Sequence, residues 1–115
     1  MHCLNGAERP TTLTLDGMHG DEYERPKAID ALMRSVNTDL LIGRLILLPA
    51  LNLLAFTAGT RLPPDDGLNL SRVFPGDPLS SLTQWISEWL SETLMPLSDH
   101  IIDLHSGGHA LKIFV

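Results

Sequence analysis

The sequence predicts an α/β domain in which a parallel or mixed β-sheet carries helices on its faces. Apolar, strand-like runs alternate along the chain with segments whose apolar residues repeat at helical spacing. An alternation of strand, helix and strand is typical of a sheet covered by helices. The 115 residues allow one domain at most, and the hydrophobic fraction of 43% is sufficient to form a core. A single domain over residues 1–115 is therefore expected.

Two strands and one helix are predicted in the first half of the chain. Threonine and leucine alternate over residues 11–15, as in a β-strand. A helix is expected over 24–36, because Pro26 suits a first helical turn and an apolar stripe follows it. The continuous apolar run at 44–48 predicts a strand that is covered on both faces. The stripe of the helix consists of Ile29, Leu32, Met33 and Val36.

The second half is expected to contain one helix and one strand after a long loop. Residues 57–77 are rich in proline and glycine, and loops of this length within a compact domain are usually functional. A helix over 82–94 would be capped by Ser80 or Ser81 and ended by Pro96, and residues 100–104 form the next strand. The run at 111–115 is also strand-like. The expected core positions of the helix are Leu82, Trp85 or Ile86, Trp89, Leu90 and Leu94.

Charge, cysteine content and hydropathy exclude several classes of protein. The net charge is −6, whereas a nucleic-acid groove needs clustered lysine and arginine. Cys3 is the only cysteine, which excludes an intramolecular disulfide. The longest apolar stretch, residues 45–56, is interrupted by Pro49 and Asn52 and is too short to span a bilayer. The opening residues lack a secretory signal, so a cytoplasmic protein that binds neither nucleic acid nor membrane is expected.

Two histidines and one glutamate follow predicted strands. His19 and Glu22 come after the first strand, and His105 comes after the strand at 100–104. Because ligands bind beyond the carboxyl ends of strands in open α/β sheets, these three side chains are expected at one edge. Two histidines and a glutamate around an open fourth position are a ligand set of catalytic zinc. Asp103 shares a strand face with position 105 and is placed to orient that imidazole. Two unrelated loop histidines are the alternative.

The long loop contributes further polar candidates. Arg61 could stabilise the oxyanion that forms when an amide is hydrolysed, since its guanidinium is a fixed positive group. Arg72 together with Asn69 could hold a substrate carboxylate. On composition alone, solvated loop charges are the favoured interpretation of these residues.

Four segments carry motifs that occur together, and in the same order, in one enzyme family. They are GMHGDEYE (17–24), GRLILLPALNLLAF (43–56), AGTRLPPDDGLNLSRVFPGDP (58–78) and DHIIDLHSGG (99–108). With these motifs the chain resembles the succinylglutamate desuccinylase/aspartoacylase family of zinc amidohydrolases, which are relatives of the zinc carboxypeptidases. The loop containing FPGDP and the DLHSGG motif look closest to the branch that deacetylates N-acetyl-diaminobutyrate in ectoine breakdown.

The resemblance implies roles for individual residues. One zinc ion per chain would be bound by His19, Glu22 and His105. Arg61 matches the arginine that polarises the scissile carbonyl, and Arg72 matches the arginine that grips a substrate carboxylate. Its usual asparagine neighbour is replaced here by Ser71, and Asn69 is the earlier asparagine of the same N-L-x-R run.

The resemblance also implies a fold, a reaction and a departure from the family. The expected fold is the three-layer α-β-α arrangement of zinc carboxypeptidase-like enzymes, truncated at its C-terminus. The expected reaction is zinc-dependent hydrolysis of the amide bond of a small N-acyl amino acid. Family members are longer and supply a general-base glutamate after the last motif. They also carry a further strand upstream of residues 11–15, which the opening residues are expected to lack. The chain is therefore expected to be an N-terminal metal-binding portion with impaired turnover.

Two other functions stay open at the level of sequence. The chain could be an inactive metal-binding fragment that pairs with a partner chain or forms a homo-oligomer, because a small sheet has open edges that invite association. It could also act on peptide bonds, as the related carboxypeptidases do.

Overall fold

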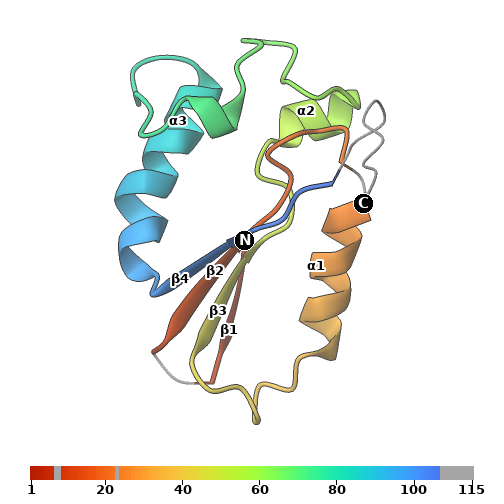
Figure 1. Ribbon diagram of the computed structural model, residues 1–115, viewed down its shortest axis with the longest axis vertical. Coiled ribbons are helices and arrows are strands. Elements are labelled where there is room, and N and C mark those ends of the chain that lie inside the picture. The colour runs from red at the N-terminus through yellow and green to blue at the C-terminus, as the bar shows by residue number, and fades with distance from the viewer. Residues whose placement is uncertain (7–8, 23, 107–115) are drawn as a thin grey trace.

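The computed structural model describes residues 1–6, 9–22 and 24–106, which form a four-stranded mixed sheet (Figure 1). The strand order is β1-β3-β2-β4. The central strand β2 runs parallel to both β3 and β4, whereas β1 runs antiparallel to β3. The strands are β1 (His2–Asn5), β2 (Thr11–Leu15), β3 (Arg44–Leu48) and β4 (His100–Asp103).

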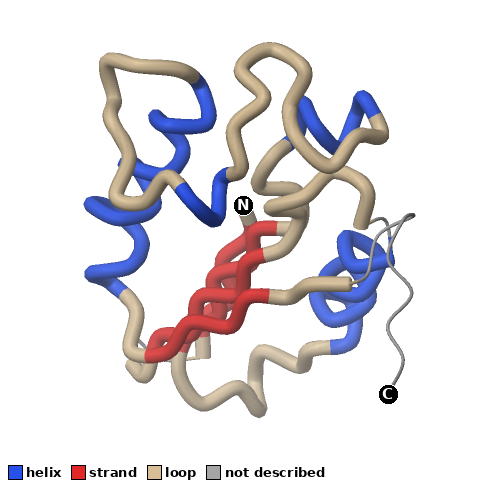
Figure 2. The backbone as a smooth tube through the Cα atoms, turned by 45° about the horizontal axis from the view of Figure 1, so that its top comes forward, coloured by secondary structure: helices blue, strands red, loops and turns tan. Residues whose placement is uncertain are grey.

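Helices lie on both sides of this sheet. α1 (Glu24–Ser35) lies on one side and α3 (Leu82–Trp89) on the other, as Figures 1 and 2 show. The predicted α/β class with a mixed sheet between helical layers is therefore confirmed. The sequence also predicts the strands at 11–15, 44–48 and 100–104 and the helix after residue 24 to within a residue or two. The strand-like run at 111–115 lies outside the described residues.

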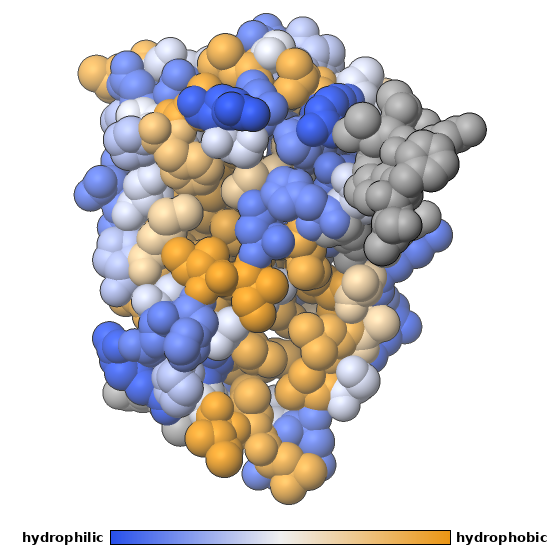
Figure 3. All heavy atoms as spheres, in the orientation of Figure 1, coloured by the Kyte–Doolittle hydropathy of each residue, from blue (hydrophilic) through white to orange (hydrophobic). Residues whose placement is uncertain are grey.

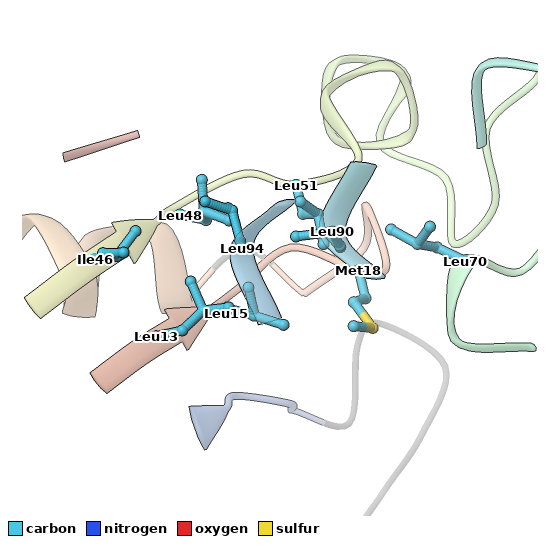
Figure 4. Close-up of a cluster of buried hydrophobic side chains, with 9 residues drawn as sticks. All are labelled: Leu13, Leu15, Met18, Ile46, Leu48, Leu51, Leu70, Leu90 and Leu94. Atoms are coloured by element: carbon cyan, nitrogen blue, oxygen red, sulfur yellow. The ribbon is translucent and has the colours of Figure 1, made fainter. Parts of the chain in front are cut away.

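One apolar cluster joins the sheet to the layer that contains α3. The central strand contributes Leu13 and Leu15, which are both almost fully buried. Burial of this kind is the main favourable term in folding, because each leucine removed from water contributes about 1.5–3 kcal/mol. The cluster, drawn in Figure 4, consists of Leu13, Leu15, Met18, Ile46, Leu48, Leu51, Leu70, Leu90 and Leu94.

The helix predicted over residues 82–94 differs from the observed one in shape and in buried face. The α-helix ends at Trp89, continues as a π-helical turn (Leu90–Leu94) and then as a 3-10 turn (Met95–Leu97) that contains Pro96. Ser81 caps it as predicted, since its side chain accepts a hydrogen bond from the backbone N–H of Gln84.

The predicted apolar stripe of α3 is wrong at Leu82 and Trp85, whereas Ile86, the predicted alternative to Trp85, packs half-buried against the core. Leu82 and Trp85 are 44% and 46% exposed, while the buried positions are Thr83 and Ser87. The reason is that α3 packs closely against the loop before it. A side chain on Gly76 would stand 2.3 Å from a carbonyl oxygen of α3, so only small residues fit at this contact. The side chain of Trp85 instead stacks on that of Trp89, with ring centroids 6.3 Å apart.

The predicted apolar stripe of α1 is also confirmed only in part. Ile29 is buried as predicted, but Leu32 is exposed, and Met33 and Val36 are half-buried. Among the described residues, no helix is long and apolar enough to cross a membrane.

Two elements are missing from the sequence prediction. The opening residues do form a strand, β1, contrary to expectation, because the backbone of β3 offers them an antiparallel partner. Helix α2 (Leu53–Ala58) interrupts what reads as one apolar run. Its ends carry standard capping residues: Asn52 accepts a hydrogen bond from the N–H of Ala55, and Gly59 adopts the left-handed conformation with φ of 68°.

Candidate metal centre

The turn that follows β2 is held tightly against the segment that follows β3. The buried Asp16 donates its N–H to the carbonyl of Leu48 at 2.9 Å and accepts from the N–H of Leu51 at 2.9 Å. The carbonyl of Gly17 accepts a further bond from the N–H of Asn52 at 2.9 Å. Gly17 has a φ of 75°, which favours glycine. The backbone therefore fixes the direction in which His19 leaves the turn.

The next glycine brings the turn into direct contact with α2. A Cβ on Gly20 would lie 2.0 Å from the carbonyl carbon of Ala55, so no side chain fits there. The N–H of Gly20 donates to the carbonyl oxygen of Arg61 at 3.3 Å. This packing buries both His19 and Glu22. Their burial follows from the glycine rather than from any apolar character of their own.

His19, Glu22 and His105 come together beyond the carboxyl ends of β2 and β4. Leu15 pairs with Asp103 across these parallel strands, and the N–H of Leu104 donates to the carbonyl of Leu15 at 3.0 Å. The potential ligand atoms of the three side chains all lie within 4.8 Å of one another, an arrangement that could hold a metal ion. The structure thus brings together the residues that the sequence predicts as a ligand set.

The distances within this His19–Glu22–His105 cluster match the size of a zinc site. Nδ1 of His19 is 3.1 Å from Oε1 of Glu22, and Nδ1 of His105 is 3.6 Å from Oε2 of Glu22. Two atoms bound tetrahedrally to one zinc at about 2.1 Å lie roughly 3.4 Å apart. The backbone N–H of Ser106 donates to Oε2 of Glu22 at 2.9 Å and orients the carboxylate. Two imidazoles and one carboxylate therefore fit zinc both by donor type and by spacing.

The second ring nitrogen of each imidazole, Nε2, lies close to a side-chain oxygen that can accept a hydrogen bond. Nε2 of His19 lies 3.2 Å from Oδ1 of Asn69, and Nε2 of His105 lies 2.7 Å from Oδ2 of Asp103. Both oxygens can accept, so with a metal in the cluster each Nε2 would carry the proton and each Nδ1 would offer its lone pair to the metal. Asp103 therefore lies beside the His105 imidazole, as the sequence predicts. Asn69, which the sequence analysis assigned to substrate binding, lies instead beside the His19 imidazole.

Arg61 lies at the rim of the cluster. Its Nη1 is 3.8 Å from Oε1 of Glu22 and also 3.8 Å from Oδ1 of Asp21, and the side chain is half exposed. A guanidinium in this place can meet the oxygen of a bound carbonyl, which is the role predicted for it. Asp21 was part of the motif recognised in the sequence, yet nothing in the sequence assigned it a partner.

The short helical turn Leu70–Arg72 carries the remaining predicted residues. Leu70 is fully buried and anchors this turn in the core. Oδ1 of Asn69 caps it, accepting from the N–H of Ser71 at 3.2 Å and from Oγ of Ser71 at 2.8 Å. Arg72 is exposed. The side chains of Asn69 and Ser71 thus bond to each other, and Asn69 alone also bonds to His19.

Residues 8–115 match the family described as the succinylglutamate desuccinylase/aspartoacylase catalytic domain. The chain belongs to the succinylglutamate desuccinylase/aspartoacylase family. The resemblance recognised in the four sequence motifs is therefore confirmed.

Individual members of this family are similar over nearly the whole chain. The N-alpha-acetyl-L-2,4-diaminobutyric acid deacetylase of Halomonas elongata is 46% identical over 106 residues, which are 92% of this chain and 31% of that enzyme. The product-bound ectoine utilization protein EutE (DoeB) of Ruegeria pomeroyi is 43% identical, with a TM-score of 0.81 over 87% of this chain and 31% of that one.

A third relative supports the same fold. The succinylglutamate desuccinylase/aspartoacylase of Rhodobacter sphaeroides is 40% identical, with a TM-score of 0.84 over 93% of this chain and 33% of that one. The chain therefore spans about a third of the length of these family members. The part that it spans contains the His19–Glu22–His105 cluster.

Proposed function

We propose that this chain binds one zinc ion and contributes to the hydrolysis of the amide bond of a small N-acyl amino acid. The family acts on substrates of this class, as the names of its deacetylase and desuccinylase members indicate. The observation that carries the proposal is the convergence of His19, Glu22 and His105, whose ligand atoms lie within 4.8 Å of one another. A cytoplasmic location remains a prediction.

The residues around the cluster have separate tasks in this proposal. His19, Glu22 and His105 would hold zinc, which when bound acts as a Lewis acid and lowers the pKa of a water molecule. Arg61 orients the carbonyl of the substrate and balances negative charge that develops on its oxygen, because a fixed guanidinium is already in place before the reaction.

The proposed substrate contacts lie on the Leu70–Arg72 turn. Arg72 extends into solvent and is free to hold a substrate carboxylate through two parallel hydrogen bonds. Asn69 and Ser71 were predicted as substrate-binding residues with it. Their hydrogen bonds in the structure favour an indirect part, in which both maintain the turn that presents Arg72.

Metal analysis tests the first half of the proposal. The purified chain, stripped with a chelator and titrated with Zn²⁺, is expected to bind one equivalent. His19→Ala should weaken this binding by more than about 100-fold, since losing a ligand has a larger effect than losing its hydrogen-bond partner. His100→Ala, on the exposed β4 strand, is the matched control and should bind zinc as the wild type does. Unchanged zinc content in His19→Ala would refute the ligand set.

A substrate panel tests the second half. Zinc-loaded chain is incubated with N-acetyl, N-succinyl and short peptide derivatives of amino acids, and the released amine is measured. Preferred cleavage of N-acyl amino acids supports the proposal, whereas preferred cleavage of peptides would favour carboxypeptidase-like specificity.

The second candidate function is an inactive metal-binding chain that pairs with a partner. It is favoured by β4, which among the described residues is an edge strand and whose four residues are all exposed, including Ile101 and Ile102 at 46% and 48%. Unpaired edges of this kind invite a further strand. Apolar side chains also gather on the face drawn in Figure 3. Light scattering of the purified chain discriminates the two: a monomer with measurable turnover contradicts this second function.

A further inference from the structure

The carboxylate of Asp21 is the least explained polar group near the cluster. Its side chain is only 11% exposed, and no described residue donates a hydrogen bond to its buried Oδ1. A buried carboxylate oxygen without a donor is unfavourable unless a positive charge lies close by. Nη1 of Arg61 supplies such a charge, at 3.8 Å from Oδ1.

The backbone brings Arg61 to this position independently of its side chain. Helix α2 ends at Ala58, and its C-cap Gly59 adopts the left-handed conformation that changes the direction of the chain. The carbonyl of Arg61 then accepts the N–H of Gly20 at 3.3 Å. Because Gly20 itself packs against the backbone of Ala55, the turn and the start of the long loop form one unit. The guanidinium of Arg61 can therefore pair with Asp21, pair with Glu22 or extend into solvent.

Glu22 is poorly suited to hold that guanidinium. Its Oε2 accepts from the backbone of Ser106, and its Oε1 faces Nδ1 of His19 at 3.1 Å. A cation held by the cluster would take up the charge of Glu22 and would repel Arg61, since like charges at a few ångströms repel strongly in a partly buried site. Asp21 is then the carboxylate that remains for Arg61.

We propose that Asp21 is a positioning residue that holds the guanidinium of Arg61 at the rim of the His19–Glu22–His105 cluster. This inference rests on the proposed function, in which Arg61 meets the substrate carbonyl, and it adds how that arginine is kept in place. Asp21 touches neither the substrate nor the metal in this proposal.

The test is the reactivity of each arginine toward phenylglyoxal, followed by peptide mass spectrometry in the chain with and without added Zn²⁺. Asp21→Asn keeps the shape of the side chain and removes its charge, so a role in packing alone would leave Arg61 unaffected. We expect Arg61 to react about threefold faster in this variant, as for loss of a half-exposed ion pair. Arg72 serves as the internal reference, and its rate should stay constant.

Two matched variants sharpen the result. Asp65→Asn makes the same charge change in the long loop that contains Arg61 and is expected to leave the Arg61 rate at the wild-type value. Asp21→Glu retains a carboxylate and is expected to keep Arg61 slow. Equal Arg61 rates in Asp21→Asn and Asp65→Asn would overturn the inference.

If Asp21→Asn does not fold, the wild-type chain alone still tests the inference. Arg61 is expected to react more slowly than Arg72 in the same sample, and equal rates would overturn the inference. Zinc binding is measured separately. A chain that binds no zinc but protects Arg61 contradicts the proposed function alone, and a chain that binds zinc with unprotected Arg61 contradicts only the role of Asp21.

Discussion

The two histidines of the cluster reach the same point from very different surroundings. His19 is 6% exposed, lies on a turn packed against α2 and is supported by the neutral amide of Asn69. His105 is 39% exposed, follows the exposed edge strand β4 and is supported by the charged carboxylate of Asp103. The His19 half depends on packing, and the His105 half depends on polar contacts that water can compete for. This difference predicts which half each substitution will damage.

The largest expected effect is that of Gly20→Ala in the His19 half. The new Cβ would lie 2.0 Å from the backbone of Ala55, so the turn must separate from α2. We expect a loss of about 3 kcal/mol or more in the free energy of unfolding, measured by urea denaturation, together with loss of zinc binding.

Gly67→Ala is the matched control for that substitution. Gly67 also has a positive φ, of 64°, but nothing lies within 4 Å of the added carbon. Only backbone strain remains, which corresponds to about 1 kcal/mol. Equal destabilisation by the two variants would show that the contact with α2 does not hold the turn.

The two supporting residues should differ in their effect on zinc affinity. Asn69→Ala leaves the buried Nε2 of His19 without a partner and should weaken zinc binding by about 10–100-fold in a competition titration with a chelator. Asp103→Ala should have a smaller effect, because solvent reaches His105 and can replace the lost acceptor. Asn69→Asp keeps the acceptor and should restore binding. A larger effect at Asp103 would reverse the comparison.

Acid should destabilise the chain through carboxylates outside the cluster. The hydrogen bond from the N–H of Thr11 lowers the pKa of Asp99, which joins the start of β4 to β2, below its usual 3.8. Burial acts to raise the pKa of Asp66, but hydrogen bonds from Ser81, Leu68 and Thr83 outweigh it and lower that pKa.

Both shifts have the same sign for stability. A folded pKa below the unfolded value gives stability that is fully present above about pH 4 and is lost as the pH falls through the folded pKa. The free energy of unfolding, measured between neutral pH and about pH 2, should therefore fall mainly at the acid end. It should fall less steeply in Asp99→Asn. An unchanged loss of stability at acid pH in that variant would contradict the assignment of part of this loss to Asp99.

The smallest effect is expected on the exposed face of β4. Ile101→Thr replaces a half-exposed residue and should change the free energy of unfolding by no more than about 0.5 kcal/mol. If β4 pairs with another chain, the same variant should shift a self-associated sample toward monomer in light scattering. A large loss of stability would mean that β4 is covered more completely than its exposure indicates.

The sequence predicts the central strands and the ligand set because both depend on local pattern. Alternation at 11–15 and the apolar run at 44–48 are sufficient to locate β2 and β3, and parallel pairing then places His19 beside His105. Strand β1 could not be predicted in this way, since its partners in β3 lie 39 to 45 residues further along the chain and its own pattern is weak.

The supporting contacts of the site depend on tertiary packing. The role of Asn69 arises because the Leu70–Arg72 turn docks into the core through Leu70, which no spacing in the sequence indicates. The small buried face of α3 likewise reflects the close approach of Gly76. Helix α2 is different: it was missed, although its capping residues Asn52 and Gly59 were visible in an otherwise apolar run.

The most direct test of the central claim is a crystal structure of the zinc-loaded chain with anomalous diffraction collected at the zinc edge. We expect one strong peak about 2.0–2.2 Å from Nδ1 of His19, a carboxylate oxygen of Glu22 and Nδ1 of His105. The account is contradicted if the peak lies elsewhere, if it contacts the Nε2 atoms instead, or if the three side chains bind no zinc.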